Sequence, residues 1–544
     1  MVNKKREYLR EKQVKSMSRK GEKVHNKVVF KEYTQNQLSL PLDMECLIPP
    51  THMVRVINQA IDQMDLSPLL EQYPGGGRAS FHPVMMTKLI VYAYTDKIFS
   101  SRRIEKAARE NIMYMWLCGG NTPDFKTINT FRSERMKEVL LHVFGEVVDL
   151  LARQGYIKLE NYFLDGTKIE ANANKYSWVW GKSTKRYKEN LQKKCRELFA
   201  LAESLNEEEN QTYGEDNLEE LGNEEKPIDS AAIEEAVKRI DEKLAAEPTN
   251  KPLKKAKRTI ETDYLPRMQK YEHQEALLAE RNSYSKTDTD ATFMRMKEDH
   301  MKNGQLKPGY NVQIGTENQY IVGYSLHQQA GDTSCLKDHL AILENQRQGQ
   351  MPKNIVADAG YGSEENYACL KEKGLGNYVK YNTFHKEATR KWKNDPTRVQ
   401  NWRYEEDLDV YYCSYGRKLC FQYERTQKSK SGYSSLVRVY ESESCEDCPH
   451  RDRCVKSEKP EAKRRIYINR KANALRAQAR ANLTGEYGLL MRSLRPVEVE
   501  SVFGQIKGNF GMRRFSLRGL EKVTLEWGWH CIAHNMRKLA AANR

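Results

Sequence analysis

Several common features are missing from this chain of 544 residues. No window approaches the ~18 uncharged apolar residues of a membrane span. The basic N-terminal region lacks the ~7–15-residue apolar core of a secretory signal. Cysteine is scarce, at 11 residues, which excludes a disulfide-built scaffold. The glycine-rich loop with lysine that binds nucleotide phosphates is also absent. We therefore expect a cytoplasmic protein with no membrane partner and no nucleotide cofactor.

Charge and size point to a globular, multidomain protein with a polyanionic partner. The chain has 90 basic and 74 acidic residues, for a formal net charge of +16. Charged residues make up 30% and hydrophobic residues 39%, which is typical of a soluble chain with a hydrophobic core. At ~150 residues per domain, about three domains are expected. The positive excess favours nucleic acid as partner, and a solvated basic surface is the alternative.

Shifts in composition and hydrophobic periodicity divide the chain into six parts. Apolar residues recur at helical spacing after a basic first segment, and two later segments are strongly polar. The predicted parts are a basic arm at 1–50, a helical domain at 51–155, an α/β core at 156–182 and 283–384, a charged helical insertion at 183–282, a Cys-rich insertion at 385–485, and C-terminal helices of the core at 486–544.

Some individual elements are also predicted. A helix begins at Pro83, one continuous helix carries the apolar stripe from Ile128 to Leu151, and a hairpin turn spans 317–319. Asp332 and His339, near or within a helix at 336–343, are assigned structural roles.

Three carboxylates stand at positions that favour metal chemistry. Two apolar segments of strand character each end in an aspartate, at Asp165 and at Asp358. A buried strand should not end in a bare carboxylate unless the charge is paired or binds a metal. Glu500 lies on a late helix, with Glu498 as its rival, and Lys507 follows two turns later on the same face. Hard oxygen ligands suit Mg²⁺ or Mn²⁺, and a pair of such ions serves phosphodiester chemistry.

The blocks around these acids resemble a known family. Asp165-Gly166-Thr167-Lys168-Ile169-Glu170, Ala357-Asp358-Ala359-Gly360-Tyr361-Gly362 and Glu500-Ser501-Val502-Phe503-Gly504-Gln505-Ile506-Lys507 are similar to the three catalytic blocks of bacterial insertion-sequence transposases of the DDE type. Residues 82–102 and 123–132 are similar to the helical domain that these transposases carry before the core, and 285–291 and 309–313 to the return into the core. The resemblance implies a ribonuclease H-like, mixed-sheet α/β core with an N-terminal all-helical domain.

The resemblance also implies roles and partners. Asp165, Asp358 and Glu500 would bind two Mg²⁺ (or Mn²⁺) ions, and Lys507 and Arg495 would contact DNA phosphates. The substrate would be double-stranded DNA, both the terminal inverted repeats and the target, held by a homodimer near the bacterial nucleoid. Arg513 and Arg514 could track the DNA backbone, with an ordinary basic surface as the alternative. A nuclease without strand transfer and a catalytically silent DNA-binding derivative are the rival functions.

A cysteine cluster lies in the second insertion. Cys445, Cys448 and Cys454 are separated by two and five residues, a spacing that suits tetrahedral Zn²⁺. Cys413 or Cys420 is a better fourth ligand than His450, and the choice between the two cysteines stays open. A small insertion with little hydrophobic core of its own can be stabilised by a bound structural metal ion. Free surface thiols are the alternative.

Overall fold

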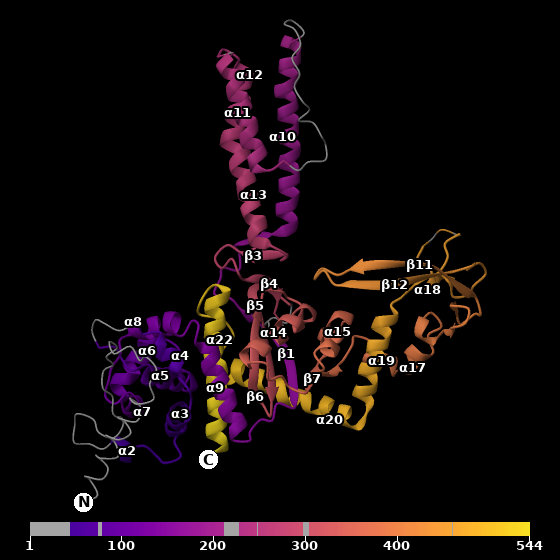
Figure 1. The fold of residues 1–544 in the computed structure, drawn as a ribbon. Helices are drawn as coiled ribbons and strands as arrows, with labels where there is room; N and C mark the ends of the chain where they lie inside the picture. Colours follow the sequence, from indigo (N-terminus) through magenta and orange to yellow (C-terminus); the bar gives the residue numbers. More distant parts are fainter. Residues whose placement is uncertain are drawn as a thin grey trace, which may run out of the picture.

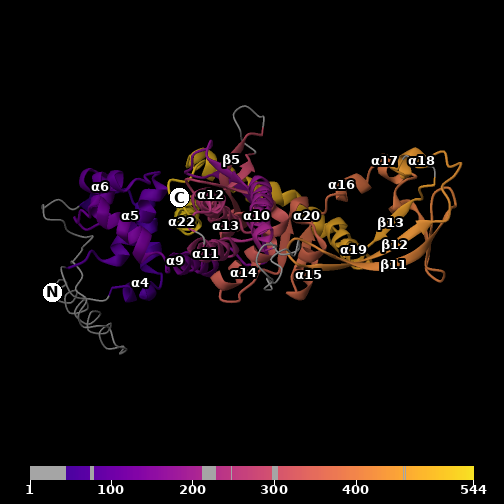
Figure 2. The same cartoon turned by 90° about the horizontal axis from the view of Figure 1, so that it is seen from above.

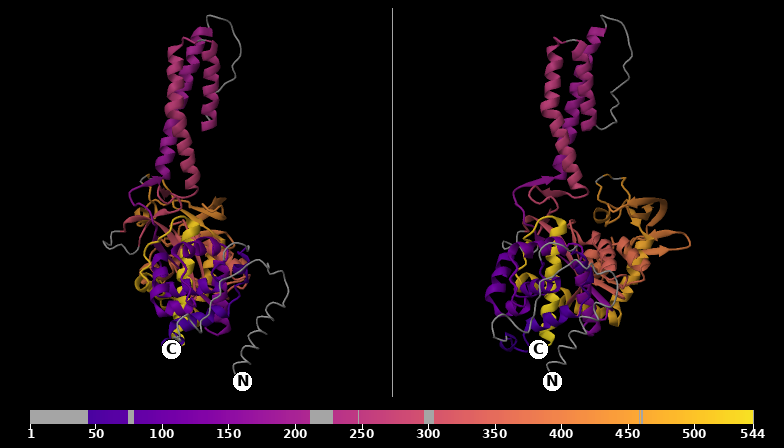
Figure 3. Two further views of the ribbon diagram at one scale, coloured as in Figure 1. Left: turned by 90° about the vertical axis from the view of Figure 1, so that its left-hand side faces the viewer. Right: turned by 60° about the vertical axis from the view of Figure 1, so that its left-hand side comes forward.

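The computed structural model describes residues 44–73, 79–210, 228–246, 248–296, 304–457, 459 and 461–543, with only the backbone described at 201–210. Most of the basic arm predicted at 1–50 lies outside these residues. Three parts stand in a row, the N-terminal helices, the central sheet and the second insertion (Figures 1 and 2). A stalk of long helices projects from the central part (Figures 1 and 3).

The N-terminal part is all-helical, and α5 forms its centre. Its helices are α2 (Met44–Leu47), α3 (Met53–Asp62), α4 (Ser67–Glu71), α5 (Pro83–Thr95), α6 (Ser101–Glu110), α7 (Ile112–Leu117), α8 (Phe125–Thr130), the π-helix η1 (Phe131–Arg135) and α9 (Leu140–Arg153). The prediction of one helix from 128 to 151 is wrong, because η1 and a turn separate α8 from α9. Met136 and Val139 are buried across this break, so the apolar periodicity continues where the helix does not.

The core is a six-stranded mixed sheet in the order β4-β5-β1-β7-β8, with β6 also paired to β5. Its strands are β1 (Asn161–Glu170), β4 (Thr292–Arg295), β5 (Leu306–Glu317), β6 (Tyr320–His327), β7 (Asn354–Ala357) and β8 (Gly376–Val379). β1 runs antiparallel to β5 and parallel to β7, and β7 runs parallel to β8. The predicted turn at 317–319 joins β5 to β6, with positive φ at Asn318 and Gln319.

Helices cover this sheet and complete the predicted fold class. They include α14 (Leu336–Gln346), α15 (Glu364–Glu372) and α22 (Leu520–Ala542). α22 packs between α5 and β6, so the C-terminal helix joins the N-terminal helices to the sheet. The ribonuclease H-like α/β fold with an N-terminal helical part is confirmed.

The first insertion leaves and re-enters the core through the short strands β2 (Trp178–Trp180) and β3 (Ser283–Ser285), which pair with each other. Between them rise α10 (Gly181–Asn210), α11 (Ser230–Ala246), α12 (Lys251–Thr259), the π-helix η2 (Ile260–Tyr264) and α13 (Leu265–Leu278). We call the helices from 181 to 278 the stalk (Figure 3). A small apolar core holds them together, formed by Leu191, Cys195, Ile233, Ile240, Leu253, Ile260 and Met268.

The second insertion is built on an antiparallel five-stranded sheet in the order β13-β12-β11-β10-β9. Its elements are α16 (Phe384–Glu387), α17 (Arg390–Lys393), the 3₁₀ helix η5 (Val399–Asn401), β9 (Arg403–Glu405), β10 (Val410–Tyr412), β11 (Lys418–Lys428), β12 (Ser434–Ser442), α18 (Arg451–Cys454) and β13 (Arg465–Ile468). Within its described residues, five buried apolar side chains pack into one cluster: Trp402, Leu419, Tyr440, Ile466 and Ile468.

The chain returns from this insertion to the core along a series of helices (Figure 1). They are α19 (Arg470–Thr484), α20 (Glu486–Arg495), the π-helix η6 (Pro496–Glu500), α21 (Ser501–Gly504) and the π-helix η7 (Gln505–Asn509). In the described part of the chain, none of the helices combines the length and apolar character needed to span a membrane.

Candidate active site

Two of the predicted carboxylates lie side by side because of strand register. β7 is paired along its whole length with β1 on one side and with β8 on the other. The residues that follow these paired stretches are Asp165, Asp358 and Lys380. This edge of a parallel sheet is where sites form in α/β folds. Asp358 follows β7 as predicted, whereas Asp165 lies inside β1, because β1 continues to Glu170 as the antiparallel partner of β5.

One guanidinium connects all three predicted acids. Arg495 Nη2 lies 3.1 Å from Asp165 Oδ1 and 3.8 Å from Asp358 Oδ2, and Nη1 lies 3.2 Å from Glu500 Oε1. The side chains of Arg495 and Asp165 are 8% and 13% exposed, whereas those of Asp358 and Glu500 are 39% and 57% exposed. The structure thus brings together residues from positions 165, 358 and 500 at a point that opens to solvent on the side of Glu500.

A break in helical geometry positions Arg495 and Glu500. α20 ends at Arg495, and the next five residues form the π-helix η6, which begins at Pro496 and ends at Glu500. Proline has no N–H to donate to the preceding turn, so a regular α-helix does not continue unchanged through it. π turns inside α-helices are frequent at functional sites. A second π-helix, η7, contains Lys507, which is buried, so Glu500 and Lys507 are not two regular α turns apart.

The two rival glutamates, Glu500 and Glu498, have different surroundings in the structure. Glu498 is 8% exposed and accepts a hydrogen bond of 2.6 Å from the backbone N–H of Gln319, in the β5–β6 turn. Burial raises the pKa of the Glu498 carboxyl. Glu498 therefore serves the contact between η6 and the sheet, whereas Glu500 contacts Arg495, the residue that also pairs with the two aspartates.

The site contains a lysine that the sequence did not indicate. Lys380 follows β8, and its backbone N–H donates to the carbonyl of Ala357. Burial lowers the pKa of the Lys380 ammonium, as do the nearby charges of Arg495 and Arg492, while Asp358 and Glu500 oppose the shift. Only the pairing of β8 with β7 shows that Lys380 belongs to the site, because a single lysine after a short strand has no distinctive sequence pattern.

A fourth carboxylate stands behind the first two. Asp332 begins the 3₁₀ helix η3 (Asp332–Ser334), and its Oδ1 accepts hydrogen bonds from Asn311 (2.8 Å) and Gln313 (3.0 Å) of β5. A Cβ on Gly166 would lie 2.6 Å from the same Oδ1, so Asp332 packs directly against the residue after Asp165. Its assignment to a purely structural role missed this proximity, because η3 is distant from β1 in the sequence.

Tyr361 completes the polar layer beneath the acids. It lies in the 3₁₀ helix η4 (Ala359–Tyr361), is fully buried, and donates a hydrogen bond from its hydroxyl to Gln313 Oε1. Burial raises the pKa of Tyr361 well above its ordinary value, and the charges of Asp332, Asp165 and Asp358 raise it further. The tyrosine is therefore a neutral donor below a cluster of negative charge.

The two predicted arginines beyond η7 lie at the end of β1. The Arg514 guanidinium donates to the carbonyls of Ala171 (3.3 Å) and Ala173 (3.4 Å), so it fixes the segment that follows β1. Arg513 is exposed, and its carbonyl accepts from the N–H of Glu170. No described contact joins these two arginines to the three acids.

The predicted cysteines gather at one end of the second insertion. Burial raises the pKa of the Cys454 thiol, Arg464 lowers it, and the charges of Cys448, Cys413 and Cys445 raise it again, which places three other thiols close by. Cys445 Sγ accepts a hydrogen bond of 3.3 Å from the N–H of Arg464. Cys420 instead lies 3.6 Å from the Glu443 carboxylate.

No metal-binding geometry is formed in the described residues as they stand: no group of three or more His, Cys, Asp or Glu side chains is arranged to hold an ion. At the acids, the space between the carboxylates contains the Arg495 guanidinium. The chemistry of the donors nevertheless suits a divalent cation, since three carboxylates from separate elements converge on one positive group.

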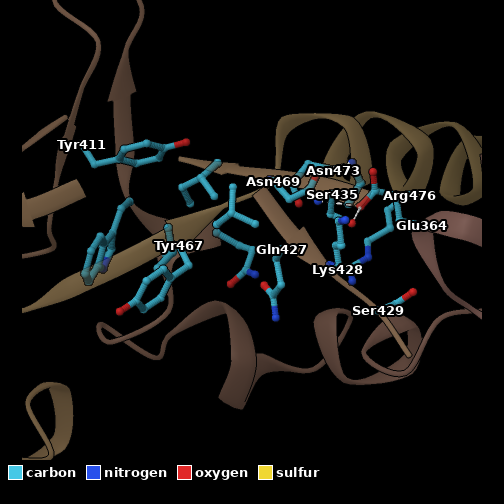
Figure 4. Close-up of a pocket in the computed structure, with 16 residues that line it drawn as sticks. Glu364, Tyr411, Gln427, Lys428, Ser429, Ser435, Tyr467, Asn469, Asn473 and Arg476 are labelled. Atoms are coloured by element: carbon cyan, nitrogen blue, oxygen red, sulfur yellow. Dashed lines mark hydrogen bonds between the residues drawn. The ribbon is translucent and has the colours of Figure 1, made fainter. Parts of the chain in front are cut away.

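A cavity lies elsewhere, in the joint between the second insertion and α15 and α19 (Figure 4). It has a volume of about 700 Å³. Tyr411, Tyr467, Gln427 and Arg476 are among the residues that line it. Glu364 at its edge accepts hydrogen bonds from Tyr433, Ser435 and Asn469, residues of the insertion and the first turn after it. The position of the cavity shows that it belongs to this joint and not to the carboxylate site.

Comparison with known families agrees with the fold. Residues 412–540 match the model of a transposase DDE domain, and residues 42–134 match that of a transposase domain (DUF772). Arg495 and Glu500 lie inside the first match, whereas Asp165 and Asp358 precede it. Neither the curated proteins nor the solved structures gave a match. Over these two stretches, and in its ribonuclease H-like core, the chain is similar to insertion-sequence transposases of the DDE type.

Proposed function

We propose that this protein is a DNA transposase, which cuts DNA at the ends of its own element and joins the freed 3′-hydroxyls to target DNA. The observation that carries the proposal is the convergence of Asp165, Asp358 and Glu500 on Arg495. One acid lies in β1, one directly follows β7 and one lies in η6. Because these segments are far apart in the sequence, their convergence on one cation is a feature of the fold. Such a cluster is unstable by itself, because like charges repel, and it needs a cation.

Asp165, Asp358 and Glu500 would hold the divalent ions that phosphodiester chemistry requires, with Mg²⁺ or Mn²⁺ as the proposed metal. Such ions, when bound, activate the attacking oxygen and stabilise the leaving oxygen. In the described structure Arg495 supplies the positive charge that the acids need. We propose that Arg495 turns from the acids to a DNA phosphate when substrate and metal bind. A guanidinium suits both partners, since its planar donors match carboxylate and phosphate alike.

Lys380 would hold a second phosphate oxygen beside Asp358. Its position after β8 places it on the same sheet edge as both aspartates. We also propose contacts to DNA, farther from the acids, for Lys507, Arg513 and Arg514. Part of the Arg514 guanidinium already donates to the carbonyls of Ala171 and Ala173, so only its remaining N–H groups could contact DNA.

The N-terminal helices would read the DNA ends, within a homodimer that holds both ends together. α6 supports this proposal, because Ile104 and Ala108 are buried while Arg102, Arg103 and Lys106 are exposed. A helix with one buried face and a basic outer face is suited to DNA phosphates. The cysteine cluster would hold a structural Zn²⁺ through Cys445, Cys448, Cys454 and Cys413.

The decisive experiment incubates the protein with DNA carrying the sequences that flank its gene, in Mg²⁺, and resolves nicked, hairpin and joined products. We expect Asp358→Ala to abolish cleavage and to leave end binding nearly intact. Cleavage without joined products would favour the rival nuclease, and binding without cleavage by the natural protein would favour the silent derivative. Mg²⁺-dependent cleavage by the Asp358→Ala variant would refute the assignment of the acids.

A further inference from the structure

The distal end of the stalk carries an uncompensated stripe of positive charge. Lys251, Lys254, Lys255 and Arg258 of α12 are all exposed. Their spacing of three, four and seven residues places them on one face of the helix. The opposite face is buried in the stalk core through Leu253, Ala256 and Ile260. We call these four cations the tip stripe.

Some other cations of the stalk, in contrast, form ion pairs within it. Lys257, beside the stripe, pairs with Asp241 of α11 and with Glu261. Arg239 pairs with Glu235, and Arg267 pairs with Asp263, each one helical turn away. Within the described residues, no ion pair involves a member of the tip stripe, and no acidic residue occurs between 251 and 260.

The stripe works against the stability of its own helix. Lys251 and Lys255, and likewise Lys254 and Arg258, are like charges at positions i and i+4, which destabilise a helix by ~0.2–0.5 kcal/mol per pair. α12 also begins at Lys251, and positive charge near a helix N-terminus opposes the helix dipole. Contacts within the described residues therefore do not account for the stripe, whereas an anion bound to it would offset this repulsion.

The stalk rises from the catalytic edge of the sheet. β1 runs toward the base of the stalk, where β3 is labelled in Figure 1; β3 pairs with β2, and α10 begins directly after β2. The return arm from α12 through α13 has 28 residues, from Lys251 to Leu278. At ~1.5 Å per residue, the tip stripe lies ~30–40 Å beyond the base of the stalk. This is the length of about 9–12 base pairs at ~3.4 Å each.

We propose that the tip stripe binds the phosphate backbone of double-stranded DNA about a dozen base pairs from the point of cleavage. The inference rests on the proposed function, which places DNA at the acids. The stalk then acts as a fixed arm that engages the DNA flank, and its contact depends on phosphates and not on base sequence.

The test compares Lys254→Gln/Arg258→Gln with Arg239→Gln/Arg267→Gln, a control that removes the same charge from paired positions on the same stalk. Glutamine keeps a helix propensity close to that of lysine and arginine. Binding is measured against salt concentration on two DNAs with the same cleavage point, one with arms of 25 base pairs and one with arms of 6. On long arms we expect the tip variant to lower the slope of log K against log salt by about 2, and the control to leave it unchanged.

On short arms the two variants should bind like the natural protein. If the tip variant loses the same slope on both DNAs, the stripe does not reach the distant flank and the placement is wrong. If it behaves like the control on long arms, an anion other than DNA, such as an acidic segment of a protein, accounts for the stripe. Failure of the natural protein to bind either DNA would instead refute the proposed function itself.

Discussion

Arg495 forms an ion pair of 3.1 Å with Asp165 in which both side chains are almost fully buried. Two more acids reach the same guanidinium from its exposed side. A buried charge that loses its partner is strongly destabilising, whereas an exposed one is screened by water. In the absence of metal, the pair with Asp165 is therefore the contact that costs most to break, and the contacts of Asp358 and Glu500 cost least to exchange for a bound ion.

Replacing the arginine should make the fold depend on divalent metal. In Arg495→Gln the three carboxylates face one another without a cation, so we expect a loss of about 1–3 kcal/mol of stability in EDTA, below the full value for a buried pair because two acids are solvated. Mg²⁺ or Mn²⁺ should raise the melting temperature of the variant by several degrees more than that of the natural protein. Equal shifts in the two proteins would show that the acids do not share a metal site.

Glu500 and Glu498 provide a matched pair of substitutions. Glu500→Gln should reduce cleavage by about 10³-fold or more, ~4 kcal/mol, while leaving DNA binding intact. Glu498→Gln should change cleavage by less than about threefold. It should also leave the fold stable at neutral pH, because the raised pKa of Glu498 means that ionisation of the buried carboxyl costs stability as pH rises. The reverse pattern would assign the third acid to Glu498.

Much of the fold was predictable because local signals and the overall fold agree. Pro83 begins α5, the turn at 317–319 joins β5 to β6, and Asp358 follows β7. The break between α8 and α9 was not predictable, since its residues keep helical periodicity while the backbone departs from it. The spacing of apolar residues predicts which face of a helix is buried, but it does not predict where the backbone hydrogen bonds change from the α-helical pattern.

The candidate site was predictable only in part for a related reason. The acids carry motif signals, but which groups surround them depends on strand pairing between distant segments. The register of β7 and β8 brings Lys380 next to Asp358 at the edge of the sheet, and the packing of η3 against β1 brings Asp332 next to Gly166. No single-sequence pattern encodes either neighbour. The π turn at Pro496 likewise alters the spacing from Glu500 to Lys507 that an ideal helix implies.

DNA binding should weaken at high pH because of Lys380. A phosphate contact needs the protonated ammonium, and burial together with Arg495 and Arg492 lowers the pKa of this lysine below its ordinary value. As pH rises through the lowered pKa, affinity measured by fluorescence anisotropy without metal should fall. Folding stability should rise over the same interval, because the unfolded lysine then holds a proton that the folded one has lost.

Two variants test the role of Lys380. Lys380→Arg should retain its charge and hold affinity to higher pH, since arginine stays protonated above pH 12. Lys380→Ala should bind several-fold more weakly at neutral pH and should lose this part of the pH dependence. An unchanged pH profile in the alanine variant would exclude Lys380 as the titrating group.

The cysteine cluster should contain zinc. Elemental analysis of the purified protein should find about one Zn²⁺ per chain, and Cys454→Ser should lose it, because the charges of Cys413, Cys445 and Cys448 all act on the Cys454 thiol and raise its pKa. Cys420→Ser is the control and should retain zinc, since Cys420 lies beside Glu443 instead. A zinc-free protein whose four thiols all react with a disulfide reagent would mean that the cluster is not a metal site.

Asp332 should act as a positioning residue for the two aspartates. It fixes Asn311 and Gln313, and Gln313 in turn accepts the hydroxyl of Tyr361 beneath the acids. Asp332→Asn keeps the shape and an acceptor for these amides but removes the negative charge that holds them, so cleavage should fall about 10–100-fold, as for other groups that orient metal ligands. The Mg²⁺ concentration for half-maximal rate should rise as well, which a general loss of stability would not produce. Asp338→Asn, at an exposed position of α14, provides the matched control. If the two asparagine variants cleave equally well at every Mg²⁺ concentration, the network around Asp332 supports only the fold and not the position of the acids.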